Sequence, residues 1–169
     1  MLRLAGKTAA GLTLAGDIAK GVLPVFLAQQ LHSSHTVIAL CGLFAFIGHC
    51  YPVYFDFRGG KGVATAFGVL AMLDWPCAIA VGAMWIGIFA LTRTSSLASL
   101  ISWTFAPVAF YFWADSYLNP LLIMVTVLIY RHYPNMFLLA KGDENRFNEP
   151  PPEKNQQQPN KKEFSDPVE

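Results

Sequence analysis

Charged side chains are scarce in this sequence. They make up 14% of its 169 residues, whereas an average soluble domain carries about 25%. The shortage is greatest before Lys141, because a large share of the charges lies in the C-terminal tail. Hydrophobic residues make up 54% of the chain. This composition argues against an ordinary soluble domain and predicts an integral membrane protein.

Cysteine is scarce too, and the net charge is only +1. The three cysteines, Cys41, Cys50 and Cys77, are odd in number and lack CxxC spacing, which argues against a disulfide framework and a zinc site. A net charge near zero gives no basic surface for nucleic acid. We therefore expect neither a metal nor a nucleic-acid partner.

Long apolar segments occupy most of residues 1–142 and predict an all-α membrane fold with short loops. A spanning helix needs about 20 mainly apolar residues. The segment 62–75 is short, which suits a half-span or a tilted helix, and we count about six crossings in all. The candidate segments are 8–31, 36–53, 62–75, 77–92, 100–114 and 117–130.

The remaining residues, 143–169, are rich in Pro, Asn, Gln and charge. Such a composition has little apolar surface to bury and is typical of disorder. We therefore divide the chain into a transmembrane domain, residues 1–142, and a disordered tail, residues 143–169, to which we assign no chemistry.

Cationic residues support the crossing count, because those between the segments all follow an even number of crossings. Lys and Arg accumulate at the cytoplasmic ends of membrane helices. We therefore expect these turns and both termini on the cytoplasmic side. The cationic residues are Arg3, Lys7, Arg58, Lys61, Arg93, Arg131 and Lys141.

A glycine-rich loop lies between the second and third segments, within residues 48–65. Its centre, Arg58-Gly59-Gly60-Lys61-Gly62, can turn backbone N–H groups inward around an anion, and the helix that follows favours an anion at its start. A flexible loop with ordinary cytoplasmic charge would explain the cations but not the glycines. The loop is not a Walker A motif, since Gly62 follows the lysine where Ser or Thr is needed. It predicts phosphate binding without nucleotide hydrolysis.

Other polar residues are expected at the same end of the helices. Ser96 and Ser99 lie one turn apart at an expected helix start, where hydroxyls bind an anion or only cap the helix. His49 and His132 lie at the ends of segments, where each is either an acid–base or phosphate-binding group or a structural residue.

Asp17 and Lys20 are three residues apart inside the first segment and therefore share a helix face. Charges within a span are costly and by default functional, although a mutually neutralised pair is the alternative. With the cationic loop, they would also suit a small transporter of organic phosphates. The sequence shows no clear internal repeat, which counts against a transporter.

Several motifs carry a resemblance to a known family: GDIAKG, GHCYPVYFDFRGGKGVAT, SLAS and RHYPNMFLLAKGDE. They resemble the bacterial glycerol-3-phosphate acyltransferases that use acyl-phosphate, whose pattern is GHxFPVxxxFxGGKGVAT. The resemblance covers almost all of residues 1–144. It implies a multi-pass enzyme of the bacterial cytoplasmic (inner) membrane, in contact with membrane lipid and with other enzymes of phospholipid synthesis.

The implied reaction transfers an acyl group from acyl-phosphate to glycerol 3-phosphate, the first step of phospholipid synthesis. The products are 1-acyl-glycerol 3-phosphate and inorganic phosphate, and the family needs no metal, cofactor or covalent nucleophile. The resemblance implies that Lys61, Ser96 and His132 are catalytic. It implies substrate binding by Arg3, Lys20, His49, Gly59, Gly60, Gly62, Thr65, Ser99 and Asn135.

The resemblance fails at the N-terminus. Family members have a further helix, for about seven spans in all, and a GSGNxGxTN loop before the residue that matches Arg3. This chain starts at Met1, within what would be the end of that loop. Two explanations remain open: a start codon assigned too late, which we favour, or a truncated and catalytically impaired paralogue.

Overall fold

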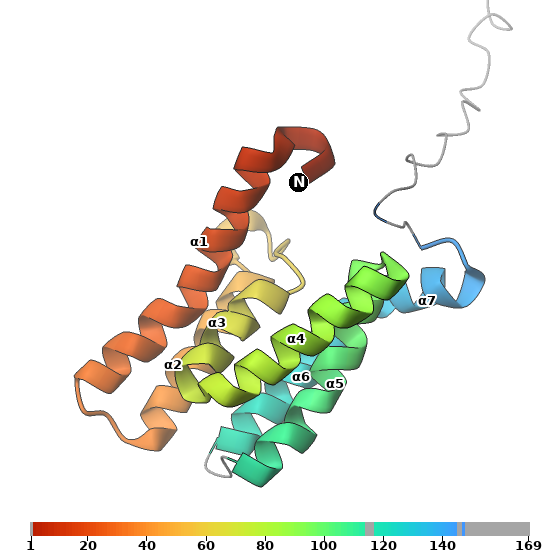
Figure 1. Ribbon diagram of the computed structural model, residues 1–169. Coiled ribbons are helices and arrows are strands. Elements are labelled where there is room, and N and C mark those ends of the chain that lie inside the picture. Colours follow the sequence, from red (N-terminus) through yellow and green to blue (C-terminus); the bar gives the residue numbers. More distant parts are fainter. Residues whose placement is uncertain (1, 114–116, 145–146, 148–169) are drawn as a thin grey trace, which may run out of the picture.

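The computed structural model is a bundle of helices (Figure 1), and it describes residues 2–113, 117–144 and 147. No strand occurs among these residues, so the all-α prediction is confirmed. The elements are α1 (Leu2–Gln30), α2 (His35–Cys50), the short 3-10 helix η1 (Val53–Phe55), α3 (Val63–Leu73), α4 (Trp75–Thr92), α5 (Ser95–Trp113), α6 (Leu118–Arg131) and α7 (Tyr133–Lys141).

Within the part of the chain that the structure describes, three segments are long and apolar enough to cross a membrane: Gly6–Gln30, His35–Phe55 and Trp75–Thr92. A fourth candidate is the pair α6 and α7, if the two helices, bent by 52°, form one span. With 11 residues, α3 is about 16 Å long and covers roughly half of a 30 Å hydrocarbon core. The count of about six crossings also includes α3, α5 and α6, and it stays a prediction.

Local signals in the sequence set the helix boundaries. Asp74 ends α3 and caps α4, where its Oδ1 accepts a hydrogen bond from the backbone N–H of Cys77 (2.8 Å). Gly142, with φ 76°, ends α7 in the left-handed conformation that glycine tolerates best. Helix α7 itself was not expected. It begins beyond His132, with Pro134 in its first turn, where proline is tolerated because the N–H there has no intrahelical partner.

Glycines allow α1 and α3 to pack with their backbones in contact. A Cβ atom on Gly21 would overlap the carbonyl oxygen of Thr65, and one on Gly68 would overlap that of Ile18. Small residues permit such close crossings in membrane proteins, where dispersion contacts drive helix association. Because α3 follows the glycine-rich loop directly, this crossing fixes the loop relative to α1.

The cationic turns gather at one end of the bundle. The connection between α2 and α3, the turn between α4 and α5, and the junction of α6 with α7 all lie at the end that also holds the start of α1 (Figure 1). Helix α7 leaves the bundle at this end. The polar residues of the sequence motifs are thus brought to one place.

The crossing of α1 and α3 yields a stability prediction. We expect Gly68→Val to destabilise the protein by about 1–3 kcal/mol, because the added carbons collide with the backbone of Ile18. The measurement is thermal unfolding of the purified protein in detergent. Gly87→Val is the matched control, since nothing lies within 4 Å of a Cβ at Gly87. Equal melting temperatures for the two variants would contradict the close crossing.

Candidate active site

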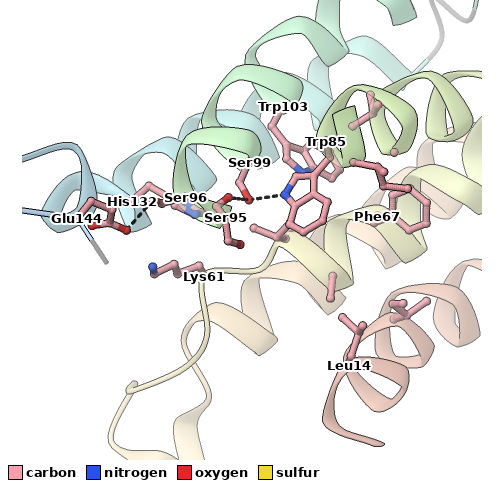
Figure 2. A pocket seen from close by; sticks show the side chains of 16 residues that line it. Leu14, Lys61, Phe67, Trp85, Ser95, Ser96, Ser99, Trp103, His132 and Glu144 are labelled. Atoms are coloured by element: carbon pink, nitrogen blue, oxygen red, sulfur yellow. Dashed lines mark hydrogen bonds between the residues drawn. The ribbon is translucent and has the colours of Figure 1, made fainter. Parts of the chain in front are cut away.

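A cavity of about 630 Å³ opens among α1, α3, α4, α5 and the start of α7 (Figure 2). Its polar end is lined by Lys61, Ser95, Ser96, His132 and Glu144. The rest is apolar, with lining residues that include Leu14, Ile18, Phe67, Val81, Ile86 and Trp103. All three residues predicted as catalytic, Lys61, Ser96 and His132, thus lie together on one cavity.

The glycine-rich loop is held by Arg131, the last residue of α6. The guanidinium Nη2 donates to the carbonyl oxygen of Gly59 (2.6 Å) and Nε to that of Gly60 (3.2 Å). The guanidinium also lies over the ring of Tyr51, 5.1 Å from its centroid. These carbonyls point at Arg131, so Arg131 fixes the path of the loop. In the sequence Arg131 is part of a motif and one of the cationic residues that support the topology, but no role in the site is predicted for it.

The loop also lies directly on the end of α2. A Cβ on Gly59 would overlap the carbonyl oxygen of His49, and one on Gly60 would overlap the His49 ring. Gly62 has φ 84° and precedes the first turn of α3, where a side chain would meet the ring of Phe46. The glycines predicted to bind substrate therefore also meet a steric requirement that only glycine satisfies.

Thr65 lies in the first turn of α3 and is fully buried. Its hydroxyl oxygen has no hydrogen-bond partner among the described residues. Buried hydroxyls are normally paired, often by water or a ligand. Thr65 does not line the cavity, and its unpaired hydroxyl lies in the first turn of α3, whose backbone N–H groups have no intrahelical partner.

Most residues predicted to bind substrate lie around the cavity without lining it: Lys20, His49, Gly59, Gly60, Gly62, Thr65 and Asn135. Lys20 and His49 form a group with Asp17. Lys20 donates to Asp17 Oδ1 (2.9 Å), and the Nδ1 atom of His49 lies 3.4 Å from the same oxygen. The predicted neighbours Asp17 and Lys20 therefore do form an ion pair. Since the His49 ring supports Gly60, the pair is connected to the loop through His49.

A carboxylate, Glu144, organises the polar end of the cavity. Its Oε1 accepts hydrogen bonds from Ser96 Oγ (2.6 Å) and Asn135 Nδ2 (2.7 Å), while Oε2 is buried without a hydrogen-bond partner among the described residues. Sequence reasoning missed Glu144, because it falls in the segment read as a disordered tail. Its position two residues beyond Gly142, at the end of the motif RHYPNMFLLAKGDE, was the available signal.

His132 is buried, with 1% of its surface exposed, where α6 gives way to α7. Its Nδ1 donates to the carbonyl oxygen of Leu128 (2.8 Å), so Nδ1 carries a proton, because a carbonyl can only accept. The other ring nitrogen, Nε2, remains for contacts within the cavity. The hydrogen bond from Nδ1 thus fixes the His132 ring and leaves Nε2 without a use in the described part of the fold.

Lys61 brings a positive charge to the cavity mouth. Although the residue as a whole is exposed, the protein packed around its ammonium lowers the pKa, Glu144 raises it, and Arg131 lowers it further. The net direction is downward. Lys61 therefore gives up its proton, and with it its attraction for anions, at a lower pH than an ordinary lysine.

Ser99, predicted to bind substrate, also lines the cavity. Its hydroxyl donates to the carbonyl oxygen of Ser95 (2.9 Å) and accepts from the indole Nε1 of Trp85 (2.9 Å). Two predictions concern residues beyond the described side chains. The side chain of Arg3 is not described, and residues 145–146 and 148–169 of the predicted tail lie outside the described range. Phe147, which is described, donates from its backbone N–H to the carbonyl oxygen of Arg93 (2.9 Å).

Comparison with known proteins decides the family. Residues 1–142 match the family described as glycerol-3-phosphate acyltransferase. The chain belongs to the glycerol-3-phosphate acyltransferase family. The glycerol-3-phosphate acyltransferase of Methylococcus capsulatus is 46% identical over 148 residues, which are 86% of this chain and 75% of that protein. That of Azotobacter vinelandii is 45% identical over 147 residues, 87% and 78% of the two chains.

Two solved structures of the acyltransferase family have the same fold. Both are of PlsY (YgiH), described as an integral membrane glycerol 3-phosphate acyltransferase. Its glycerol 3-phosphate form has a TM-score of 0.82 at 35% identity, covering 86% of this chain and 74% of that one. Its lysophosphatidic acid form has a TM-score of 0.81 at the same identity and covers 76% of that chain. The resemblance seen in the motifs is confirmed, as is an integral membrane acyltransferase.

The position of Arg131 predicts a defect in substrate binding rather than in folding. Lysine cannot reproduce two hydrogen bonds from one planar fork, so we expect Arg131→Lys to raise KM for glycerol 3-phosphate by about tenfold, consistent with loss of a charge-assisted hydrogen bond. The measurement is steady-state kinetics in detergent. Arg93→Lys, a change at an exposed arginine of another turn, is the control and should leave KM unchanged.

Glu144 yields a prediction that separates geometry from charge. In Glu144→Gln the amide oxygen still accepts from Ser96 and Asn135, so this variant should retain more activity than Glu144→Ala. The alanine variant leaves both donors unpaired, which costs about 1–3 kcal/mol for a buried group such as Ser96. Comparing kcat of the two purified variants tests this. Equal losses would mean that the carboxylate charge, rather than its hydrogen bonds, is what the site needs.

Proposed function

We propose that the protein transfers an acyl group from acyl-phosphate to glycerol 3-phosphate. The products are 1-acyl-glycerol 3-phosphate and inorganic phosphate, as in the first step of phospholipid synthesis. The observation that carries this proposal is the two-part cavity, with donors and a cation at one end and apolar side chains along the rest. Such a cavity suits phosphate groups at the polar end and an acyl chain in the apolar part.

The relatives support the acceptor and the product. Those cited above are named glycerol-3-phosphate acyltransferases, and the solved neighbours are glycerol 3-phosphate and lysophosphatidic acid forms. They favour an acyltransferase over a transporter of organic phosphates. The acyl-phosphate donor rests on the motif resemblance.

The reaction needs little from the protein beyond placement and charge. The hydroxyl oxygen of glycerol 3-phosphate attacks the carbonyl carbon of acyl-phosphate and forms the ester bond. The bond between that carbon and the phosphate oxygen breaks, and phosphate leaves with the electron pair. A phosphate oxygen takes the hydroxyl proton. Holding the two substrates together supplies the orientation, and fixed donors stabilise the developing charge.

Each residue at the polar end has a role in this scheme. Lys61 binds phosphate oxygens, and Nε2 of His132, which is an acceptor because Nδ1 carries the proton, accepts a hydrogen bond from a hydroxyl group of glycerol 3-phosphate. Ser96 donates a hydrogen bond to Glu144, so its oxygen remains an acceptor that orients the glycerol hydroxyl. Asn135 uses one N–H on Glu144 and has a second for substrate. Further phosphate contacts come from Gly59, Gly60, Gly62 and Thr65. Lys20 and His49 support the loop from behind. Ser99 faces the acyl chain, and Arg3 binds substrate at the start of α1.

The site lies, in this proposal, at the cytoplasmic face of the bacterial inner membrane. The cationic turns share the end of the bundle that holds this site (Figure 1), and such turns favour the cytoplasm. Both termini then face the cytoplasm, where other enzymes of phospholipid synthesis could supply acyl-phosphate. Acyl chains enter from the lipid side.

The test is a transfer assay with purified protein, a synthetic acyl-phosphate and glycerol 3-phosphate, read by mass spectrometry of lysophosphatidate. We expect Lys61→Ala to reduce kcat/KM by about 10²–10³-fold, as for loss of one donor to developing charge. Arg58→Ala is the matched control, because Arg58 is an exposed cation of the same loop that does not line the cavity. Equal activity of Lys61→Ala and the unmodified protein would refute the site. Phosphate-ester flux into sealed vesicles without acyl product would instead favour the transporter.

A further inference from the structure

The apolar part of the cavity contains one rigid side chain close to its polar end, Trp85. We propose that Trp85, held in place by Ser99, determines which acyl groups the site accepts, and that it responds to bulk next to the carbonyl carbon rather than to total chain length. This inference rests on the proposed function, since it assumes that an acyl-phosphate occupies the cavity.

Two contacts fix the indole of Trp85. Its Nε1 donates to Ser99 Oγ (2.9 Å), and its ring stacks on Phe89 with centroids 5.0 Å apart and planes 14° from parallel. Ser99 is itself 2% exposed and donates to the backbone of Ser95. Because one contact fixes the edge of the ring and the other its plane, Trp85 forms a stiff wall.

The position of this wall decides which part of a substrate meets it. Ser99 lies about one helical turn, roughly 5 Å, beyond Ser95 and Ser96 at the polar end. Figure 2 shows the Trp85 ring beyond Ser99 and on the way to Phe67. A substrate with its phosphate at Lys61 and its carbonyl near Ser96 must therefore pass its first carbons along the indole.

The inner end of the cavity is closed. Val81 and Trp103 lie one turn further along α4 and α5 and are each 1% exposed. Ser96 and Trp103 are seven positions apart on α5, so the closed part is only about 10 Å deep. A long acyl chain cannot fit within that depth.

The side of the cavity is open between α1 and α4. Leu14 and Ile86 line the cavity there and are 55% and 65% exposed, on surfaces that face lipid in an integral membrane protein. A long chain leaves the cavity by this side. Carbons beyond the opening contact lipid, so the protein does not select for their number. Trp85, in contrast, limits the width available to the first carbons.

The test compares three donors: palmitoyl phosphate, dodecanoyl phosphate, and palmitoyl phosphate with a methyl branch on the carbon next to the carbonyl. The unmodified protein should use both straight chains with similar kcat/KM and the branched one at least about tenfold less well, since one methyl group in a fitted pocket is worth 10–200-fold. In Trp85→Ala the kcat/KM values for the branched and straight donors should become similar. If the alanine variant does not fold, Trp85→Leu replaces it in the test, because leucine keeps apolar bulk at this position.

Ser99 is a positioning residue in this proposal, and a double-mutant cycle identifies it as one. As a single substitution, with Trp85 intact, Ser99→Ala should weaken discrimination against the branched donor. It should have no further effect in Trp85→Phe, which lacks the N–H. The matched controls are Trp75→Phe, at an exposed tryptophan of the same helix, and Ser102→Ala, at a buried α5 serine outside the cavity lining. Both should retain the original discrimination.

The outcomes separate this inference from the proposed function. If the unmodified protein forms no product from any acyl-phosphate, the proposed function is wrong and this inference is wrong with it. If it forms product but Trp85→Ala discriminates as the unmodified protein does, only the role of Trp85 is overturned. An additive effect of Ser99→Ala on Trp85→Phe overturns the link between the two residues.

Discussion

The contact of Arg131 with two glycine carbonyls supports the rest of the site. Gly59 and Gly60 belong to the connection between α2 and α3, whereas Arg131 ends α6, more than 70 positions later. Glycines give that connection many conformations in isolation. Arg131 selects one, and the next residue in the chain is His132. A single side chain therefore joins the cationic loop to the histidine and brings both to the same cavity.

The polar end combines a carboxylate with a site proposed for anions. Glu144 accepts hydrogen bonds from Ser96 and Asn135. Burial and Arg131 lower the pKa of Lys61, and Glu144 opposes them by raising it. A negative group costs some affinity for phosphate, but it fixes two donors and helps keep the lysine charged. The site thus depends on balanced charges and not on the sum of its cations, which is consistent with a net charge of only +1 for the whole chain.

Local chemistry explains which features the sequence could predict. Helices follow from apolar runs and caps such as Asp74, and an anion loop follows from glycines beside Lys61. Lys61, Ser96 and His132 are brought together as expected. Arg131, Glu144 and Trp85 were missed or left without a role because their importance lies in partners far away in the chain: two carbonyl oxygens, a serine and an asparagine, and the hydroxyl of Ser99. Composition gave no signal for Glu144 either, since it lies in a segment with little apolar surface to bury.

The 52° bend between α6 and α7 has a consequence for the order in which the protein is made. It turns the chain so that Glu144 returns to Ser96, on a helix synthesised 48 residues earlier, while Asn135 donates to the same carboxylate. The packed helices α1 to α5 are complete before these residues leave the ribosome. The hydrogen-bond acceptor that fixes the donors of the site is therefore translated after α7, and the nascent membrane domain acquires its finished site only when helices α1 to α7 have all been made.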